Sequence, residues 1–336
     1  MVPKSESMRR RDVLLFGAAC LAAAGGSRSI AHAQSAYPQR PIKLVIPFAA
    51  GGVADALGRL WAQQVKETLG PVFIENQGGG GGAVGGAAVA RANPDGYTIL
   101  LTSATSQVIV PAAAGHAPND PAKDLELVSI VALTGMAFAV TPGLPVEDLK
   151  GLIAYAKANP AKLAYGSAGI GTVPHLAGEL LKSLTGANDI VHVPYKGGAQ
   201  AVADVLSGQV PMVISSITGQ MVELHRDGKV RLLAVTMPER SRIAPEIPTA
   251  LEAGLPGMIA QNVYGLLVPA GTPPAIVRQI YAATHAAITD PEFARRLVAA
   301  GFEPYPDPSP EAARHVIDEE VVRWTPIVRT LALKLD

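Results

Sequence analysis

The chain has 336 residues, of which 49% are hydrophobic and 17% are charged. This balance excludes a disordered chain, and the length favours two compact domains over one. The 28 Lys and Arg residues are matched by 28 Asp and Glu residues, so the chain lacks the basic signature of a nucleic-acid-binding protein.

The first 33 residues are typical of an export signal. Three arginines at 9–11 precede an apolar run over 13–24, and the small-x-small sequence at 31–33 predicts cleavage after Ala33. The arginines fit either a twin-arginine signal or a general secretory signal, and both lead to the periplasm. The apolar run is too short to span a bilayer. The single cysteine, Cys20, lies in this signal, so we expect no disulfide and no cysteine metal site in the mature protein.

Strands and helices are predicted to alternate after the signal. An apolar run over 42–48 predicts a buried strand that ends in a glycine turn. The pattern continues with a helix over 53–69, a strand over 72–75, a glycine run over 78–82, a helix over 84–92 and a strand over 97–102. This order predicts an α/β lobe whose sheet is flanked by helices and whose ligand lies beyond the carboxyl ends of the strands.

The same order restarts in the second half of the chain. An apolar segment over 128–140 is followed by helices over 146–159, 174–185 and 199–207 and by strands over 163–166, 190–193, 210–215 and 232–236. A strand over 263–268 and helices over 275–289, 291–300 and 310–333 complete the chain, and these helices are expected to pack on the first lobe. We therefore expect lobe 1 to contain 34–137 and 262–336, lobe 2 to contain 138–261, and two hinge crossings to join them.

Two glycine-containing loops, 48–55 and 167–175, each follow a predicted strand and precede a predicted helix. Their backbone N–H groups and the positive ends of the two helices would point into the same space, which suits an anion. The hydroxyls of Ser167 and Thr172 are expected to donate hydrogen bonds to it.

Motifs along the whole mature chain resemble one known family. The first half carries Ile46-Pro47-Phe48, Gly51-Gly52 with Asp55, and Pro94-Asp95-Gly96-Tyr97-Thr98; the second carries the 167–175 loop, His192-Val193-Pro194-Tyr195-Lys196-Gly197 and Pro269-Ala270-Gly271-Thr272-Pro273. In this order they are similar to the Bug receptors, the substrate-binding family of tripartite tricarboxylate transporters. The resemblance implies a type II periplasmic binding protein fold, a carboxylate held between the lobes, and membrane transporter subunits as partners. It implies a monomeric receptor rather than an enzyme, with no catalytic residue, cofactor or metal.

The two loops and the resemblance together predict the ligand-binding residues. They are Phe48, Ala49, Gly51, Gly52, Asp55, Ser103, Ser167, Ala168, Gly171, Thr172, His175, Ser215 and Tyr264. Two of them have a second interpretation: Asp55 lies in a first helical turn, where an acid interacts favourably with the helix dipole, and His175 is equally suited to bond a backbone carbonyl. His175 and Glu179 are four residues apart on one helix, but no third ligand is evident, so no metal site is expected.

The chain departs from the family pattern at several positions. Ala50 replaces a usual proline, Val53-Ala54 replaces a Gly-Thr-like pair, and Tyr264 stands where a tryptophan is expected nearby. Ser215-Ser216 replaces an Asp-Asn pair, which removes a partner for an ammonium group. We therefore expect amino acids to bind worse than acids without an amino group, and the identity of the carboxylate stays open.

Gly80, Gly82 and Gly85 fit a dinucleotide-binding pattern and raise one alternative function, an exported NAD(P)-dependent oxidoreductase. The acid that such a site needs about 20 residues further on is missing, because that position is Thr105. No hydrolase nucleophile elbow is present either, since Tyr165 occupies the place of its first glycine.

Overall fold

The computed structural model describes residues 37–110, 121–305, 307 and 309–331, and the predicted signal over 1–33 lies outside the described residues. All described helices and strands belong to one compact unit that begins at Arg40. Within these described ranges, none of the helices combines the length and apolar character that a bilayer crossing needs.

The first set of strands, called sheet A, has the order β2-β1-β3-β9-β4, with β10 also paired to β4. Its strands are β1 (Ile42–Ile46), β2 (Val72–Asn76), β3 (Thr98–Ser103), β9 (Gln261–Pro269), β10 (Glu303–Pro304) and the first part of β4 (Leu125–Val140). Strand β1 is parallel to β2 and β3, whereas β9 is antiparallel to both β3 and β4. The apolar run of β1 is almost wholly buried, as expected for a strand covered on both faces.

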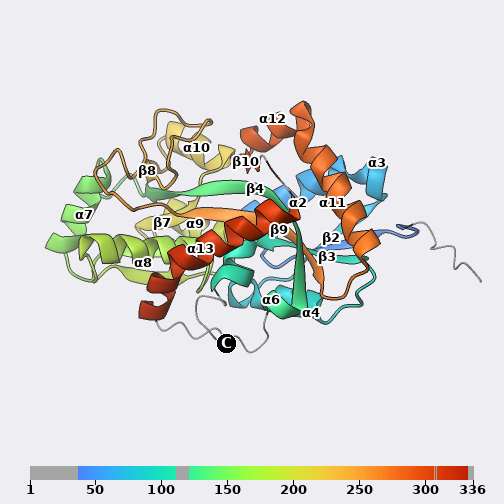
Figure 1. Cartoon of the computed structure of the whole chain (residues 1–336). Coiled ribbons are helices and arrows are strands. Elements are labelled where there is room, and N and C mark those ends of the chain that lie inside the picture. The colour runs from blue at the N-terminus through green and yellow to red at the C-terminus, as the bar shows by residue number, and fades with distance from the viewer. Residues whose placement is uncertain (1–36, 111–120, 306, 308, 332–336) are drawn as a thin grey trace, which may run out of the picture. The chain divides into compact units, whose positions relative to one another are not determined.

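The second set of strands, called sheet B, has the order β4-β7-β5-β6, with β8 also paired to β4. Its further strands are β5 (Ala164–Ser167), β6 (Val191–Pro194), β7 (Met212–Ser216) and β8 (Arg231–Val235). Strand β4 runs through both sheets (Figure 1): Gly135 pairs with Gln261 of β9, and the next residue, Met136, pairs with Ser216 of β7. The chain therefore passes from sheet A into sheet B within one continuous strand.

Helices flank both sheets, which confirms the predicted α/β class. Around sheet A lie α2 (Val53–Gln64), α3 (Lys66–Leu69), α4 (Ala83–Ala90), α11 (Pro274–Thr289) and α12 (Pro291–Ala299). Around sheet B lie α7 (Leu149–Ala158), α8 (Val173–Thr185), α9 (Gly198–Leu206) and α10 (Gly219–Arg226). Three short elements complete this part: η1 (Gly80–Gly82), η2 (Thr105–Ile109) and α6 (Pro121–Asp124).

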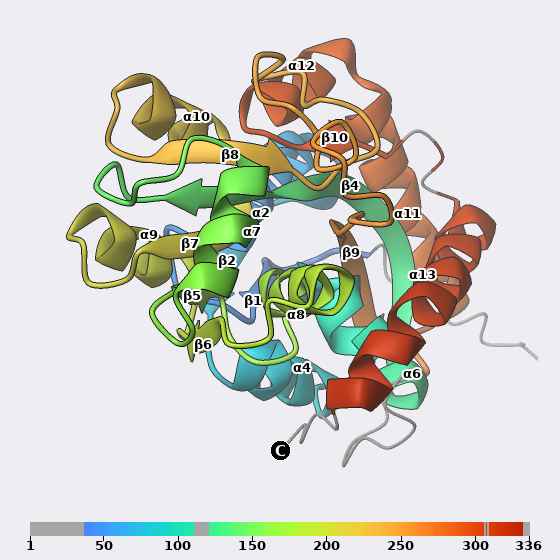
Figure 2. The same ribbon diagram turned by 90° about the vertical axis from the view of Figure 1, so that its left-hand side faces the viewer.

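The last helix, α13 (Pro310–Leu331), contributes to the packing of both sheets. Near its start, Ala313 packs with Ile130 and Val263 of sheet A. Near its end, Trp324 and Val328 are buried in the same core as the apolar face of α8, and the two helices lie close together in Figure 2. The predicted lobe boundaries, at 137/138 and 261/262, stay a prediction.

Several elements differ from the sequence-based expectation, and the short elements η1, η2, α6 and β10 were not predicted at all. The helix predicted over 53–69 is divided into α2 and α3 at Val65, which leaves the helical region of backbone space. Helix α10 was not predicted, because only Met221 and Val222 of its eight residues are buried and its apolar pattern is correspondingly short. Its start is fixed by Thr218, whose side chain accepts the N–H of Met221 at 3.2 Å.

Candidate functional site

A pocket lies where loops from sheet A meet loops from sheet B. Three helices begin at its wall: α2 after Gly52, α8 after Thr172 and α9 after Gly197. None of these three N-cap residues caps its helix with a side chain, so first-turn N–H groups are left to bond other acceptors. Three positive helix ends at one pocket favour an anion there.

The pocket is small and has no Asp, Glu, Lys, Arg or His among its lining residues. Its volume is about 50 Å³, enough for a few water molecules, whereas organic ligands usually occupy pockets of about 300–1,000 Å³. The surrounding loops must therefore separate to admit an organic ligand. The lining residues are Phe48, Ala49, Gly52, Val53, Ala54, Ser103, Ser106, Ala168, Thr172, Pro174, Gly197, Gly198, Ala199, Ser215, Ser216, Asn262 and Tyr264.

Asp55 organises the loop between β1 and α2 from behind the pocket wall. Its carboxylate accepts the Gly51 N–H at 3.0 Å, the Asn76 amide at 3.1 Å and the Arg59 guanidinium at 2.9 and 3.0 Å. Burial acts to raise the Asp55 pKa, but these hydrogen bonds outweigh it and hold the pKa below its ordinary value. The buried, ionised side chain thus fixes Gly51 in the loop just before α2.

The loop between β5 and α8 is held by its own hydroxyls. Ser167 Oγ accepts the Gly169 N–H at 3.1 Å and lies 2.6 Å from His192 Nε2. The Thr172 hydroxyl donates to the Gly169 carbonyl at 2.6 Å. We expected the Ser167 and Thr172 hydroxyls to donate hydrogen bonds to a ligand, but both bond within the protein. In the pocket, Thr172 Oγ1 can only accept a hydrogen bond.

Two stacked histidines support this loop from below. His175 Nδ1 accepts the Gly171 N–H at 3.2 Å, and its ring centroid lies 4.1 Å from that of His192, which in turn stacks on Tyr165 at 4.9 Å. Burial lowers the pKa of both histidines, to about 3 for His192, and the nearby Lys182 charge adds to this effect. Both rings are therefore neutral at pH 7, as the acceptor role of His175 requires.

The wall contributed by β9 and η2 carries unsatisfied polar atoms. The Asn262 amide donates to the Tyr264 hydroxyl at 2.9 Å, and both residues are buried. Asn262 Oδ1 and Ser106 Oγ are also buried, yet neither has a hydrogen-bond partner among the described residues. Because buried polar atoms are normally paired, a water molecule or a polar ligand group in the pocket would satisfy these two.

The structure brings most of the predicted site residues to the pocket wall. These are Phe48, Ala49, Gly52, Ser103, Ala168, Thr172, Ser215 and Tyr264. The others, Gly51, Asp55, Ser167, Gly171 and His175, are not among the lining residues and make the hydrogen bonds that hold the two loops. A contact with ligand stays a prediction for each of them.

Sequence reasoning missed the third helix start at the pocket, formed by residues 197–199. The same signal that identified the other two loops was present, because the 194–198 turn also follows a strand and precedes a helix. Ser106 and Asn262 were missed as well, and nothing in their local sequence marks them, since their position depends on how η2 and β9 pack.

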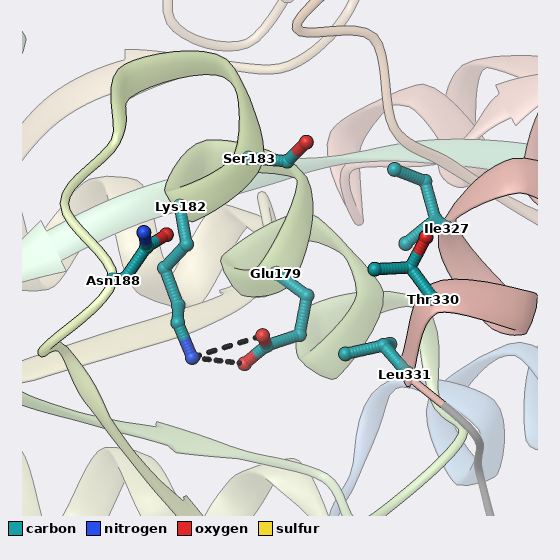
Figure 3. A pocket seen from close by; sticks show the side chains of 7 residues that line it. All are labelled: Glu179, Lys182, Ser183, Asn188, Ile327, Thr330 and Leu331. Carbon is teal, nitrogen blue, oxygen red and sulfur yellow. Dashed lines mark hydrogen bonds and ion pairs between the residues drawn. The ribbon is translucent and has the colours of Figure 1, made fainter.

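A second hollow, of about 450 Å³, lies between α8 and the end of α13 (Figure 3). Its two charged residues, Glu179 and Lys182, pair with each other at 2.9 and 3.0 Å. Glu179 also accepts a hydrogen bond from the Tyr165 hydroxyl at 3.1 Å. The ion pair therefore anchors the aromatic cluster beneath the second loop, and we assign no ligand to this hollow.

The glycine pattern that suggested a dinucleotide-binding site packs against other parts of the chain. A Cβ atom on Gly82 would lie 2.5 Å from the Gln107 side chain, and one on Gly85 would lie 2.7 Å from Pro47 Cβ. These two glycines therefore serve close packing within the fold. Among the residues that the structure describes, no three His, Cys, Asp or Glu side chains are grouped as metal ligands would be.

Comparison with known proteins agrees with this geometry. The profile of the Tripartite tricarboxylate transporter family receptor matches residues 57–333. Protein BugT of Bordetella pertussis (strain Tohama I) is 34% identical over 303 residues, which cover 89% of this chain and 91% of BugT.

Two solved structures have similar folds. MatC from Rhodopseudomonas palustris, solved with bound malate, has a TM-score of 0.81 and 31% identity. The match covers 87% of this chain and 100% of the MatC chain. Rpa4515 from R. palustris, solved with adipate, has a TM-score of 0.82 and 32% identity. The match covers 88% of this chain and 98% of the Rpa4515 chain. The predicted fold of a periplasmic binding protein is thereby confirmed.

Proposed function

Because the chain belongs to the tripartite tricarboxylate transporter receptor family, we propose that it closes on a small carboxylate in the pocket between sheets A and B. The observation that carries this proposal is the meeting of three uncapped helix N-termini at a pocket without charged side chains. There the backbone N–H groups would bind the carboxylate, and no fixed cation would be needed.

The chain is a receptor and not an enzyme, since its family consists of substrate-binding receptors. The alternative of an exported NAD(P)-dependent oxidoreductase is wrong.

The ligand we propose is a dicarboxylate without an amino group. MatC binds malate and Rpa4515 binds adipate, so acids of this size are the first candidates. Ser215 and Ser216 line the pocket and no acid does, which leaves an ammonium group without an ionic partner. The unsatisfied Ser106 Oγ and Asn262 Oδ1 support a ligand with a second polar end.

Members of this family are periplasmic binding proteins, and we propose the same location for this chain, reached through a signal over 1–33 that is removed after Ala33. In our proposal the closed, monomeric receptor presents its ligand to membrane transporter subunits or to a sensor. The change of surface on closing would distinguish the loaded receptor from the empty one.

Native mass spectrometry of protein purified from the periplasm, without denaturation, tests the proposal. The expected result is a bound small acid that is lost when the protein is unfolded and refolded in ligand-free buffer. A bound nicotinamide cofactor would contradict it, and so would an empty protein that takes up no carboxylate from a panel containing malate and adipate.

A further inference from the structure

Two neighbouring glycines of the glycine run both have positive φ but have different surroundings. Gly80 has φ 56° and Gly81 has φ 64°, so both lie in the left-handed region that favours glycine. A Cβ atom on Gly80 would have the Ala83 Cβ as its nearest neighbour at 3.4 Å, whereas one on Gly81 would lie 2.3 Å from the Ile170 carbonyl oxygen. Only at Gly81 would an alanine side chain collide with backbone.

The Gly81 contact joins the two sheets. Gly81 follows β2 of sheet A, and Ile170 lies in the loop after β5 of sheet B. The same loops approach one another again at Gly169, where a Cβ atom would lie 3.5 Å from the Gly81 Cα. A further approach joins the pocket walls, because a Cβ atom on Gly197 would lie 3.4 Å from the Ala49 Cβ. Backbone from sheet A thus touches backbone from sheet B around the pocket.

These contacts must break when a ligand enters, because the pocket of about 50 Å³ is too small to be filled from outside without movement. We infer that Gly81 is a further determinant of ligand affinity, because it permits the final approach of the Ile170 loop when the receptor closes. This inference rests on the proposed function, since it assumes that the two sheets open and close around a ligand.

A cysteine pair across the pocket can report closing without a ligand. Ala49→Cys and Gly197→Cys would place their Cβ atoms about as far apart as the 3.4 Å measured between Ala49 Cβ and the ideal Gly197 Cβ, close to the span of a disulfide. Gly197 has extended backbone at φ 170°, which any residue adopts. Because Cys20 is the only native cysteine, the full chain with Cys20→Ser carries no competing thiol. Disulfide formation in a fixed glutathione buffer is followed by mass spectrometry after alkylation.

In the chain that carries the cysteine pair, we expect Gly81→Ala to slow disulfide formation at least tenfold. Gly80→Ala should change the rate of disulfide formation less than twofold. The Gly80 variant is the matched control, since it also places a side chain at a positive φ but without the contact to Ile170. Equal rates for the two variants would overturn the inference. It would also be wrong if Gly81→Ala lowered the melting temperature of the unliganded protein far more than Gly80→Ala, because the contact would then be permanent.

Adding malate or adipate tests the proposed function separately. Either acid should accelerate disulfide formation in the parent cysteine pair if it closes the receptor. Because both cysteines replace residues of the pocket wall, the melting temperature of the native chain is measured with the same acids. If no carboxylate raises it while the two glycine variants still differ, the proposed function fails and the closing contact stands.

Discussion

A negative charge placed in the pocket should oppose a carboxylate ligand strongly. Ala168 lines the pocket, is half-buried, and lies in the loop between β5 and α8. The lining has no Lys, Arg or His to neutralise an aspartate there. Two unit charges about 5 Å apart at an effective dielectric constant of about 20 repel by about 3 kcal/mol, which corresponds to a loss of affinity of roughly 100- to 200-fold.

Ala168→Asn is the control for Ala168→Asp, because the two side chains have the same size and differ in charge. Isothermal titration with the carboxylate that binds the wild type should show the 100-fold loss for the aspartate variant and a much smaller loss for the asparagine variant. The deficit should shrink below about pH 4, where an ordinary aspartate becomes protonated. Equal affinities for the two variants at pH 7 would refute the claim that an anionic group binds in this pocket.

The remaining predictions concern the support beneath the second loop. In the folded protein the pKa values of His175 and His192 lie below the unfolded value of about 6.5, and that of His192 is about 3. The stability that the neutral rings provide is therefore complete above about pH 6.5 and is lost as the pH falls towards 3. For His192 alone the free energy of unfolding should fall by about 2 kcal/mol between pH 7 and pH 5, and His192→Gln should flatten this dependence in urea titrations; an unchanged slope would contradict the assigned neutral state. Gly178→Ala should lower stability by about 1–3 kcal/mol, although alanine is the better helix former, because its Cβ would lie 2.2 Å from the Tyr165 ring. A higher melting temperature for this variant would show that the ring moves aside freely.

Periodicity and turn residues were enough to predict the alternation of strands and helices. The apolar run of β1, the glycine turn after it and the apolar face of α2 are local signals, and each is present in the sequence within a few residues. Helix α10 lacked such a signal, since only Met221 and Val222 are buried. Local patterns placed the crossing between the lobes within the apolar segment over 128–140, but they could not give the strands that β4 pairs with, because β7, β8 and β9 lie far away in the chain.

The candidate site was predictable where a loop carries its own signal. Glycine between a strand and a helix identified the loops at Gly52 and Thr172, and the same rule applied to Gly197 would have added the third helix start. The division between wall and support was not predictable. Asp55 bonds Arg59 of its own helix, and His175 bonds Gly171 of its own loop. Their other partners, Asn76 and His192, lie on other strands and are brought to them by the fold.

The central claim, a receptor that closes on a small carboxylate, is tested most directly by the melting temperature with matched ligands. A ligand at about 100 times its dissociation constant stabilises the folded protein by about 2.7 kcal/mol, and each kcal/mol raises the melting temperature of a protein of this size by roughly 2–4 °C. We predict that a dicarboxylate from a panel that begins with malate and adipate raises the melting temperature by roughly 5–11 °C, while its diamide, which has the same shape and no charge, raises it by less than about 1 °C. A diamide that stabilises the protein as well as its acid, or a panel in which no carboxylate shifts the melting temperature, would contradict the account.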